Sequence, residues 1–246
     1  MYNVACFSNQ DRQDLFTETS QKLHIHQGII EKDFWVCWIL SALFTSKQWH
    51  DKLIFKGGTS LSKVFRLISR FSEDIDLILD WRLLGYTDDD LWKDRSNTQK
   101  DKFCKEVNQK NAEFIRANFV PSFKAELDAI LKSDVKVEFD GESVNISYPK
   151  TFSTAYVLPV IRLEIGPLAA WVPHAEFQIS SYAAEVYPKF FTSPSCTVTT
   201  TMAERTFWEK ATILHQQAMR GYISPHYSRH YYDLAQMVNS NVKNKA

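Results

Sequence analysis

The 246-residue sequence has no net charge and little glycine or proline. Lysine and arginine together number 29, and aspartate and glutamate also number 29, so the formal net charge at pH 7 is zero. A chain with this balance has no global basic field that would attract nucleic acid over its whole surface. Any nucleic-acid binding must therefore use a local patch.

The sequence also lacks clustered cysteines. Its four cysteines are far apart and form no C-x-x-C pair: Cys6, Cys37, Cys104 and Cys196. This spacing argues against a zinc site and provides no disulfide framework. Free thiols in a reducing compartment are the simplest interpretation.

Long apolar runs are absent as well. The longest, 34–44, is shorter than the ~20 residues that a membrane-spanning helix needs, and residues 1–13 lack the basic-then-apolar order of a signal peptide. We therefore expect a cytoplasmic protein with no membrane partner. The hydrophobic content of 44% is enough for a sizeable core in one or two domains.

The most informative stretch is 53–79. An apolar run at 53–55 is followed by the glycine pair at 57–58, then by a helical pattern at 61–68 and by a stretch at 72–79 that contains acidic and apolar residues. This order predicts a strand, a tight turn, a helix and a strand.

The second strand of this unit carries polar residues on one face. Because side chains alternate along a strand, Ser72, Asp74 and Asp76 are expected to point the same way. Two adjacent carboxylates repel each other, and a hard cation between them removes that repulsion. Mg²⁺ favours such a site together with substrate phosphates, and Mn²⁺ is the alternative ion.

The glycine turn suggests a binding site for those phosphates. Residues without a side chain let backbone N–H groups approach a phosphate closely, and the following helix points its positive end at the same place. The predicted nucleotide-binding set is Lys56, Gly57, Gly58, Thr59, Ser60 and Ser72. A lone Gly-Gly is usually a turn and a lone Asp-x-Asp a solvated surface, but their combination within one unit favours nucleotidyl transfer.

Further elements are expected around this unit. Amphipathic spacing predicts a helix at 11–24, and a largely apolar pattern predicts a buried helix at 31–44. Residues 98–131 predict one long helix, or two helices broken near Pro121. A hairpin is expected at 134–148 and a strand at 160–165.

Residues 92–124 carry an excess of basic residues. Lysine and arginine number eight there, and aspartate and glutamate number four. The excess suits an RNA-facing surface, but a solvated helix face explains it equally well. Both interpretations remain open at the level of sequence.

The last third of the chain predicts a change of architecture. The Pro- and Ser-rich segment 166–196 is expected to be a long connection with short strands, which divides a lobe of residues 1–195 from a helical lobe of residues 196–246. A capping-box pattern predicts a helix starting at Thr201. Lys210 lies on the apolar side of that helix, where it needs a charged partner or a ligand, or must extend to solvent.

Four stretches of the chain resemble a known family. They are residues 31–36, 55–61 with 70–77, 204–210 and 229–234. The Gly-Gly and Asp-x-Asp pattern is similar to the polymerase-β-type nucleotidyltransferases. The combination of all four resembles the AbiEii/AbiGii nucleotidyltransferase toxins.

This resemblance implies a fold and a set of site residues. The fold would be α+β, a mixed sheet flanked by helices with a helical C-terminal lobe. Lys210 and Asp233 would join Asp74 and Asp76 as catalytic residues, with Asp233 expected in the first turn of a helix at 229–238. Glu164 would be a third metal ligand, although an exposed pair with Arg162 is the alternative.

The resemblance also implies a function. Family members use Mg²⁺ to transfer a nucleoside monophosphate from an NTP to the 3′ end of tRNA, as toxins of type IV toxin–antitoxin and abortive-infection systems that act in phage defence. An antitoxin encoded nearby would be a partner. A small-molecule acceptor, a protein acceptor and a non-enzymatic nucleotide-binding module remain alternatives.

Overall fold

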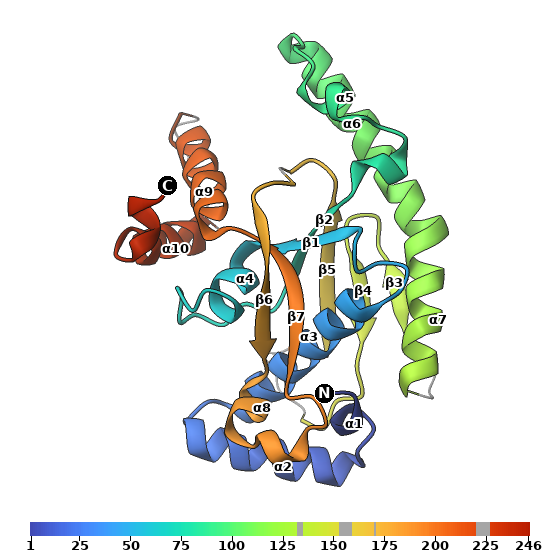
Figure 1. Ribbon diagram of the computed structural model, residues 1–246, viewed down its shortest axis with the longest axis vertical. Helices are drawn as coiled ribbons and strands as arrows, with labels where there is room; N and C mark the ends of the chain where they lie inside the picture. Colours follow the sequence, from blue (N-terminus) through green and yellow to red (C-terminus); the bar gives the residue numbers. More distant parts are fainter. Residues whose placement is uncertain (132–134, 153–158, 170, 220–226) are drawn as a thin grey trace.

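A mixed β-sheet forms the centre of the fold (Figure 1). The computed structural model describes residues 1–131, 135–152, 159–169, 171–219 and 227–246. In this part of the chain, the strands form one sheet in the order β3-β4-β5-β2-β1-β7-β6. The strands are β1 (Leu53–Lys56), β2 (Ile75–Leu79), β3 (Val137–Phe139), β4 (Val144–Ser147), β5 (Val160–Gly166), β6 (His174–Ser180) and β7 (Ser195–Thr201).

The three central strands run in mixed directions. β2 pairs antiparallel with β1 and parallel with β5. Alternation along these strands places Phe55, Leu77 and Leu163 on the face that packs into the main hydrophobic core. The opposite face is therefore free to carry polar side chains. The expected mixed sheet flanked by helices is confirmed.

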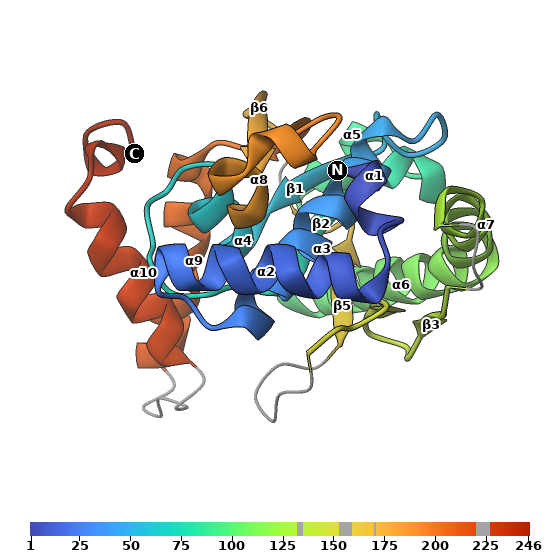
Figure 2. The ribbon, with the colours of Figure 1, turned by 90° about the horizontal axis from the view of Figure 1, so that it is seen from below.

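The N-terminal helices cover the core face of the sheet. They are α1 (Tyr2–Ala5), α2 (Asn9–Leu23) and α3 (Gln27–Thr45). Seen from below, α2 lies across α3 (Figure 2). The predicted buried helix is α3, in which Phe34, Trp35 and Trp38 are at most 1% exposed.

Two acidic residues in the first half of α3 are buried. Glu31 is 2% exposed and Asp33 1%, although acidic side chains usually lie at the surface. The carboxylate of Glu31 accepts hydrogen bonds from the backbone N–H groups of Thr151 and Phe152. Asp33 forms an ion pair with Lys63. These contacts with distant segments compensate for the removal of the carboxylates from water.

The basic segment forms one long helical arm rather than two separate helices. α6 (Asn97–Phe114) continues through a π-helical turn (Ile115–Phe119) into α7 (Val120–Leu131). Pro121 has no N–H to donate, and the wider turn just before it accommodates that loss without ending the helix. A 3-10 turn (Trp81–Leu84) and α5 (Asp88–Trp92) precede this arm.

The C-terminal third contains more sheet than its sequence indicated. The segment 166–196, predicted as a long connection with short strands, contains the seven-residue strand β6, α8 (Tyr182–Val186), a 3-10 turn (Pro188–Phe190) and the start of the seven-residue strand β7. Two helices follow, α9 (Ala203–Met219) and α10 (Ser228–Val238), and then a final 3-10 turn (Asn241–Asn244).

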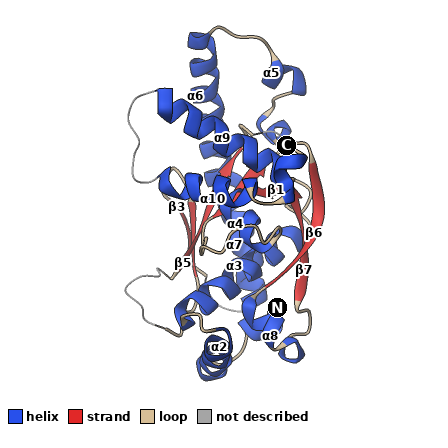
Figure 3. Ribbon diagram, turned by 90° about the vertical axis from the view of Figure 1, so that its left-hand side faces the viewer, coloured by secondary structure: helices blue, strands red, loops and turns tan. Residues whose placement is uncertain are grey.

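Helices α9 and α10 lie beside the sheet, next to α4 (Gly57–Lys63) (Figures 1 and 3). Strand β7 follows the predicted lobe boundary and pairs with β1 and β6. The division into lobes of residues 1–195 and 196–246 stays a prediction. None of the helices in the described ranges is long and apolar enough to cross a bilayer.

Candidate active site

The turn between β1 and α4 brings the glycine pair against the end of β2. Gly57 has a φ of +79°, a conformation that side chains disfavour. A Cβ at Gly57 would lie 1.8 Å from Oδ2 of Asp76, and a Cβ at Gly58 would lie 2.8 Å from Nη2 of Arg70 and 3.0 Å from Oγ of Ser72. The missing side chains thus make room for polar groups from the segment that enters β2.

The hydroxyl groups after the glycine pair are turned inward. Helix α4 starts at Gly57, earlier than the helix expected from Leu61, and both Thr59 and Ser60 are fully buried. Oγ1 of Thr59 donates to the carbonyl of Asp74. Oγ of Ser60 donates to the carbonyl of Gly57, 2.8 Å away. These bonds hold the turn and the start of β2 together. A direct nucleotide contact of either hydroxyl stays a prediction.

Three charged residues stand in a row across the polar face of the sheet. Lys56 on β1 is the partner of Asp76 on β2, which in turn is the partner of Glu164 on β5. Paired residues on adjacent strands point to the same face. The strand β2 begins only at Ile75, so Asp74 precedes it. Asp74 nevertheless lines the same cavity as these three residues.

The cavity that these four residues line has a volume of about 190 Å³. Its lining brings together eight of the predicted site residues, from the β1–α4 turn, the segment that leads into β2, β2 itself, β5 and α9: Lys56, Gly57, Gly58, Ser72, Asp74, Asp76, Glu164 and Lys210. We call it the catalytic pocket. Of the other predicted site residues, Asp233 forms an ion pair with Lys210, and Thr59 and Ser60 are buried in α4.

The carboxylates in the pocket influence each other. Burial raises the pKa of Asp76 to about 6, with Lys56 opposing this shift and Glu164 and Asp74 adding to it. A cation between Asp76 and Asp74 would relieve this unfavourable charge, so the donor set fits a hard divalent ion. Within the described ranges no three His, Cys, Asp or Glu side chains form a group that could hold a metal. The fit therefore rests on Asp74 and Asp76 with substrate phosphates, and the role of Glu164 as a third ligand stays a prediction.

Lys210 faces this carboxylate side from α9. It is only 6% exposed, and its Nζ lies 2.9 Å from Oδ2 of Asp233. The expectation that this inward lysine has a charged partner is confirmed. Helix α9 begins at Ala203, whereas Thr201 ends β7, so the predicted capping box at Thr201 is wrong.

Asp233 is the centre of a buried ion cluster. It lies in the middle of α10, not in the first turn as expected, and is fully buried. Both its oxygens accept hydrogen bonds from Arg70, Nε to Oδ1 and Nη2 to Oδ2, each at 2.7 Å. Burial alone would raise the pKa of Asp233, but the bonds from Arg70 and the charge of Lys210 lower it. Asp233 is therefore ionised and fixes both cations.

Sequence reasoning assigned no role to Arg70. The signal that could have revealed it is its position two residues before Ser72, in the segment that leads into the Asp-x-Asp strand. A buried carboxylate that meets only one lysine would also have left oxygen lone pairs to satisfy. Arg70 supplies the second cation and ties the segment before β2 to α10.

His230 and Arg229 also line the pocket without having been predicted. The Nδ1 of His230 lies 3.4 Å from Nζ of Lys210. Burial lowers the pKa of His230 to about 4, and the charges of Lys210 and Arg229 add to this effect. His230 is therefore neutral at pH 7 and accepts from Lys210 through Nδ1, which leaves Nε2 as the protonated nitrogen.

The pocket thus has two chemically different walls. The carboxylate wall contains Asp74 and Asp76, and the cationic wall contains Arg70 and Lys210. The carboxylates can hold a divalent ion, and the cations opposite them can bind phosphate oxygens. This combination is suited to transfer of a phosphoryl or nucleotidyl group.

Known proteins resemble this chain to different degrees. A search of curated proteins found no match. Among solved structures the chain is similar to MenT4, a nucleotidyltransferase toxin of Mycobacterium tuberculosis, with 17% sequence identity and a TM-score of 0.45. The match covers 80% of this chain and 57% of that one, so the chain spans a little over half the length of this neighbour.

A family model supplies the stronger result. The model described as nucleotidyl transferase AbiEii toxin, type IV toxin–antitoxin system, matches residues 38–246, which include both walls of the catalytic pocket. The chain belongs to the AbiEii family of nucleotidyltransferase toxins of type IV toxin–antitoxin systems.

Proposed function

We propose that this protein transfers a nucleoside monophosphate from an NTP to an RNA acceptor, with the 3′ end of tRNA as the first acceptor to test. The observation that carries the proposal is one pocket in which Asp74 and Asp76 lie opposite Lys210, whose position is fixed by Asp233. Family membership supports the reaction class.

Asp74 and Asp76 would hold Mg²⁺, with Mn²⁺ as the alternative ion. When bound, the ion supplies charge neutralisation on the phosphates. The two carboxylates are suited to hold the ion because both line one pocket. Gly57 and Gly58 line the same pocket and leave their backbone open to the phosphates.

Lys210 would bind a phosphate oxygen of the NTP as negative charge develops. Its ammonium group already has Asp233 on one side, so it is held in place before substrate binds, and such prearranged charges contribute strongly to catalysis. Lys56, Ser72 and Arg229 line the same cavity and would add donors to the triphosphate.

Asp233 acts through Lys210 and Arg70 in this scheme. The sequence left open whether Asp233 orients the lysine or the incoming hydroxyl group. Its side chain is fully buried, and both its oxygens already accept hydrogen bonds from Arg70. The geometry therefore supports the positioning of Lys210.

The biological setting belongs to the same proposal. Membership of a type IV toxin–antitoxin family supports an antitoxin partner, and a modified tRNA pool would stop growth of the cell. We extend this to a cytoplasmic toxin that acts in abortive infection and phage defence.

The test is transfer of label from each α-labelled NTP to total tRNA in the presence of Mg²⁺. We expect one nucleotide to label tRNA, and Asp74→Ala to lower the rate on the order of 10²-fold or more. Asp51→Ala, at an exposed position, is the matched control and should retain wild-type activity.

The remaining acceptors are outcomes of the same assay. Label on a small molecule or a protein from a lysate, with tRNA unlabelled, would preserve the reaction and contradict the acceptor. NTP binding without transfer to any of these would instead indicate a nucleotide-binding module.

A further inference from the structure

A second cavity, of about 390 Å³, lies at the N-terminal end of the helical arm. It is formed by the 3-10 turn at 81–84, the end of α5 and the connection to α6, the first half of α6, the segment after β5 and the start of α9. Four cationic residues line it, and among the described lining residues none is acidic: Lys93, Arg95, Lys100 and Arg205. We call this cavity the basic groove.

The basic groove is linked to the catalytic pocket through shared lining residues. It shares Leu168 and Ala169 with an intervening cavity of about 350 Å³. That cavity in turn shares Asp76 and Glu164 with the catalytic pocket. Helix α9 makes a second connection, since Arg205 lines the groove and Lys210, on the same helix, lines the pocket.

The chemistry of the groove suits a nucleic-acid strand. Arg95 stacks over Phe103, with its Cζ 3.8 Å from the ring centroid, and a planar guanidinium supported in this way can stack on a base. The Nε of Arg205 is buried and has no hydrogen-bond partner in the described part of the chain. A phosphate oxygen would satisfy such a donor.

We propose that the basic groove binds the single-stranded nucleotides of the RNA acceptor that lie next to its reacting 3′ end. Lys93, Lys100 and Arg205 contact the phosphates, and Arg95 stacks on a base. This inference rests on the proposed function. It gives an RNA-binding role to three of the basic residues in 92–124, namely Lys93, Arg95 and Lys100. The sequence alone could not distinguish such a role from a solvated helix face.

An RNA strand fits the groove better than a protein partner does. An acceptor must reach Asp76, and the shared lining residues place the groove, the intervening cavity and the pocket that contains Asp76 next to one another. A protein that docked on the arm would need no such arrangement. The absence of carboxylates from the described lining also matches a polyanion.

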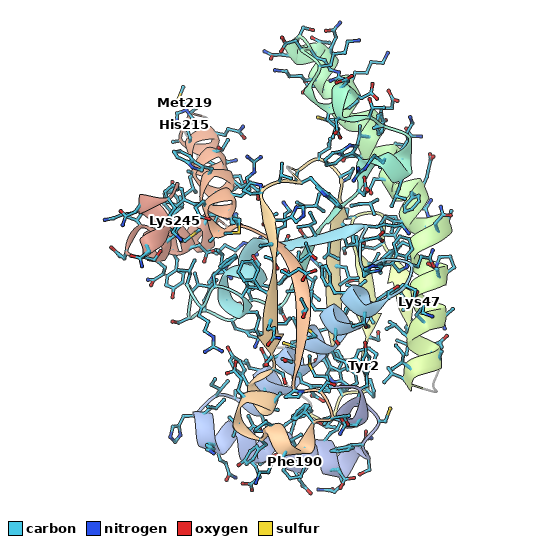
Figure 4. The ribbon with its side chains drawn as sticks, in the orientation of Figure 1. Tyr2, Lys47, Phe190, His215, Met219 and Lys245 are labelled. Carbon is cyan, nitrogen blue, oxygen red and sulfur yellow. The ribbon has the colours of Figure 1, made fainter. Side chains whose placement is uncertain are left out.

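The test is the triple variant Lys93→Gln, Arg95→Gln and Lys100→Gln, with Arg205→Gln made separately. The matched control removes three positive charges elsewhere, at the exposed positions Lys22, Lys47 and Lys189, of which Lys47 lies far from α5 and the start of α6 (Figure 4). Circular dichroism of all variants establishes that they are folded.

We expect the triple variant to bind tRNA at least 10-fold more weakly than the control variant, with NTP affinity unchanged. The slope of log affinity against log salt concentration should fall by about 1.4, since the variant loses the phosphate contacts of Lys93 and Lys100 and each such contact to a single strand contributes about 0.7. Equal tRNA affinity and equal slopes in the triple and control variants would overturn the proposal. Loss of antitoxin binding with tRNA binding intact would overturn it in favour of a protein partner.

A thiol footprint gives an independent readout. Cys104 lines the groove, whereas Cys6 lies near α1, and both are exposed. Bound tRNA should slow alkylation of Cys104 and leave the rate at Cys6 unchanged, while equal rates with and without tRNA would contradict the proposal. Because binding needs no transfer, the footprint is also run on Asp74→Ala, so failure of the groove and failure of the proposed reaction are distinguishable.

Discussion

The two walls of the catalytic pocket are built from very different parts of the chain. The carboxylate wall comes from one stretch. Gly57 lies in its turn, Asp76 pairs with a neighbouring strand, and the carbonyl of Asp74 accepts a hydrogen bond from Thr59 at the start of α4. The cationic wall joins Arg70 before β2 to Asp233 on α10, residues separated by 163 positions in the sequence. Lys210 on α9 completes it.

This difference indicates how each wall is stabilised. Backbone pairing holds the carboxylate wall, so a change in one carboxylate alters chemistry and leaves the sheet intact. Buried ion pairs hold the cationic wall, so the loss of one partner leaves an uncompensated charge inside the protein. We therefore expect substitutions in the two walls to separate activity from stability.

The largest effect is expected at Asp76. Asp76→Asn keeps the shape of the side chain and removes its charge, so we expect kcat for nucleotidyl transfer to fall about 10³-fold, or about 4 kcal/mol of barrier. Because burial already disfavours the charged form of Asp76, the melting temperature should not fall. Single-turnover assays and thermal melts measure both quantities. More than a tenth of wild-type activity would show that this carboxylate is dispensable.

Asp233→Ala should instead affect activity and stability together. It leaves Lys210 and Arg70 without their shared carboxylate, and such a loss costs about 3 kcal/mol of unfolding free energy. Urea denaturation beside the exposed control Asp51→Ala measures the difference. An unchanged midpoint together with lost activity would mean that the two walls are not stabilised differently.

Gly57→Ala tests the contact between the turn and the carboxylate wall. The new Cβ would occupy the position of the Asp76 carboxylate, and the backbone at Gly57 is left-handed. We expect a loss of about 2 kcal/mol in stability and lower activity. Gly85→Ala is the matched control, since its φ is +80° and its Cβ would meet nothing within 4 Å. Equal losses in the two variants would show that backbone strain alone matters.

The smallest effect concerns pH. Burial holds the pKa of His230 near 4, below the ordinary value of 6.5. The unfolded state therefore binds the proton more readily, and the stability contributed by neutral His230 is lost as pH falls from about 6.5 towards 4. In His230→Gln the free energy of unfolding should decline less over this interval. If the free energy of unfolding fell equally with pH in the wild type and in His230→Gln, the assignment of a neutral imidazole would be contradicted.

The sequence predicted the carboxylate wall well because its parts are close together in the chain. The order of strand, glycine turn, helix and strand at 53–79 is local, and the alternation of Asp74 and Asp76 with apolar residues follows from strand geometry. The hairpin around Asp140 and Gly141 was predicted for the same reason and is present as β3 and β4.

The cationic wall and the buried charges of α3 depend on long-range contacts. No local pattern indicates that Arg70 meets Asp233, or that Asp33 meets Lys63. The inward position of Lys210 was predictable from helical spacing, but its partner needed the family resemblance. The π-helical turn before Pro121 was missed because a proline in a helical pattern usually predicts a break.

The most direct test of the central claim compares two tRNA preparations. One is intact, and in the other periodate oxidation has destroyed the 3′-terminal hydroxyl groups. With Mg²⁺ and each α-labelled NTP in turn, the account predicts label on intact tRNA alone, and none with Asp76→Asn. Equal labelling of both tRNA preparations, or no labelling of intact tRNA by any of the NTPs, would contradict it.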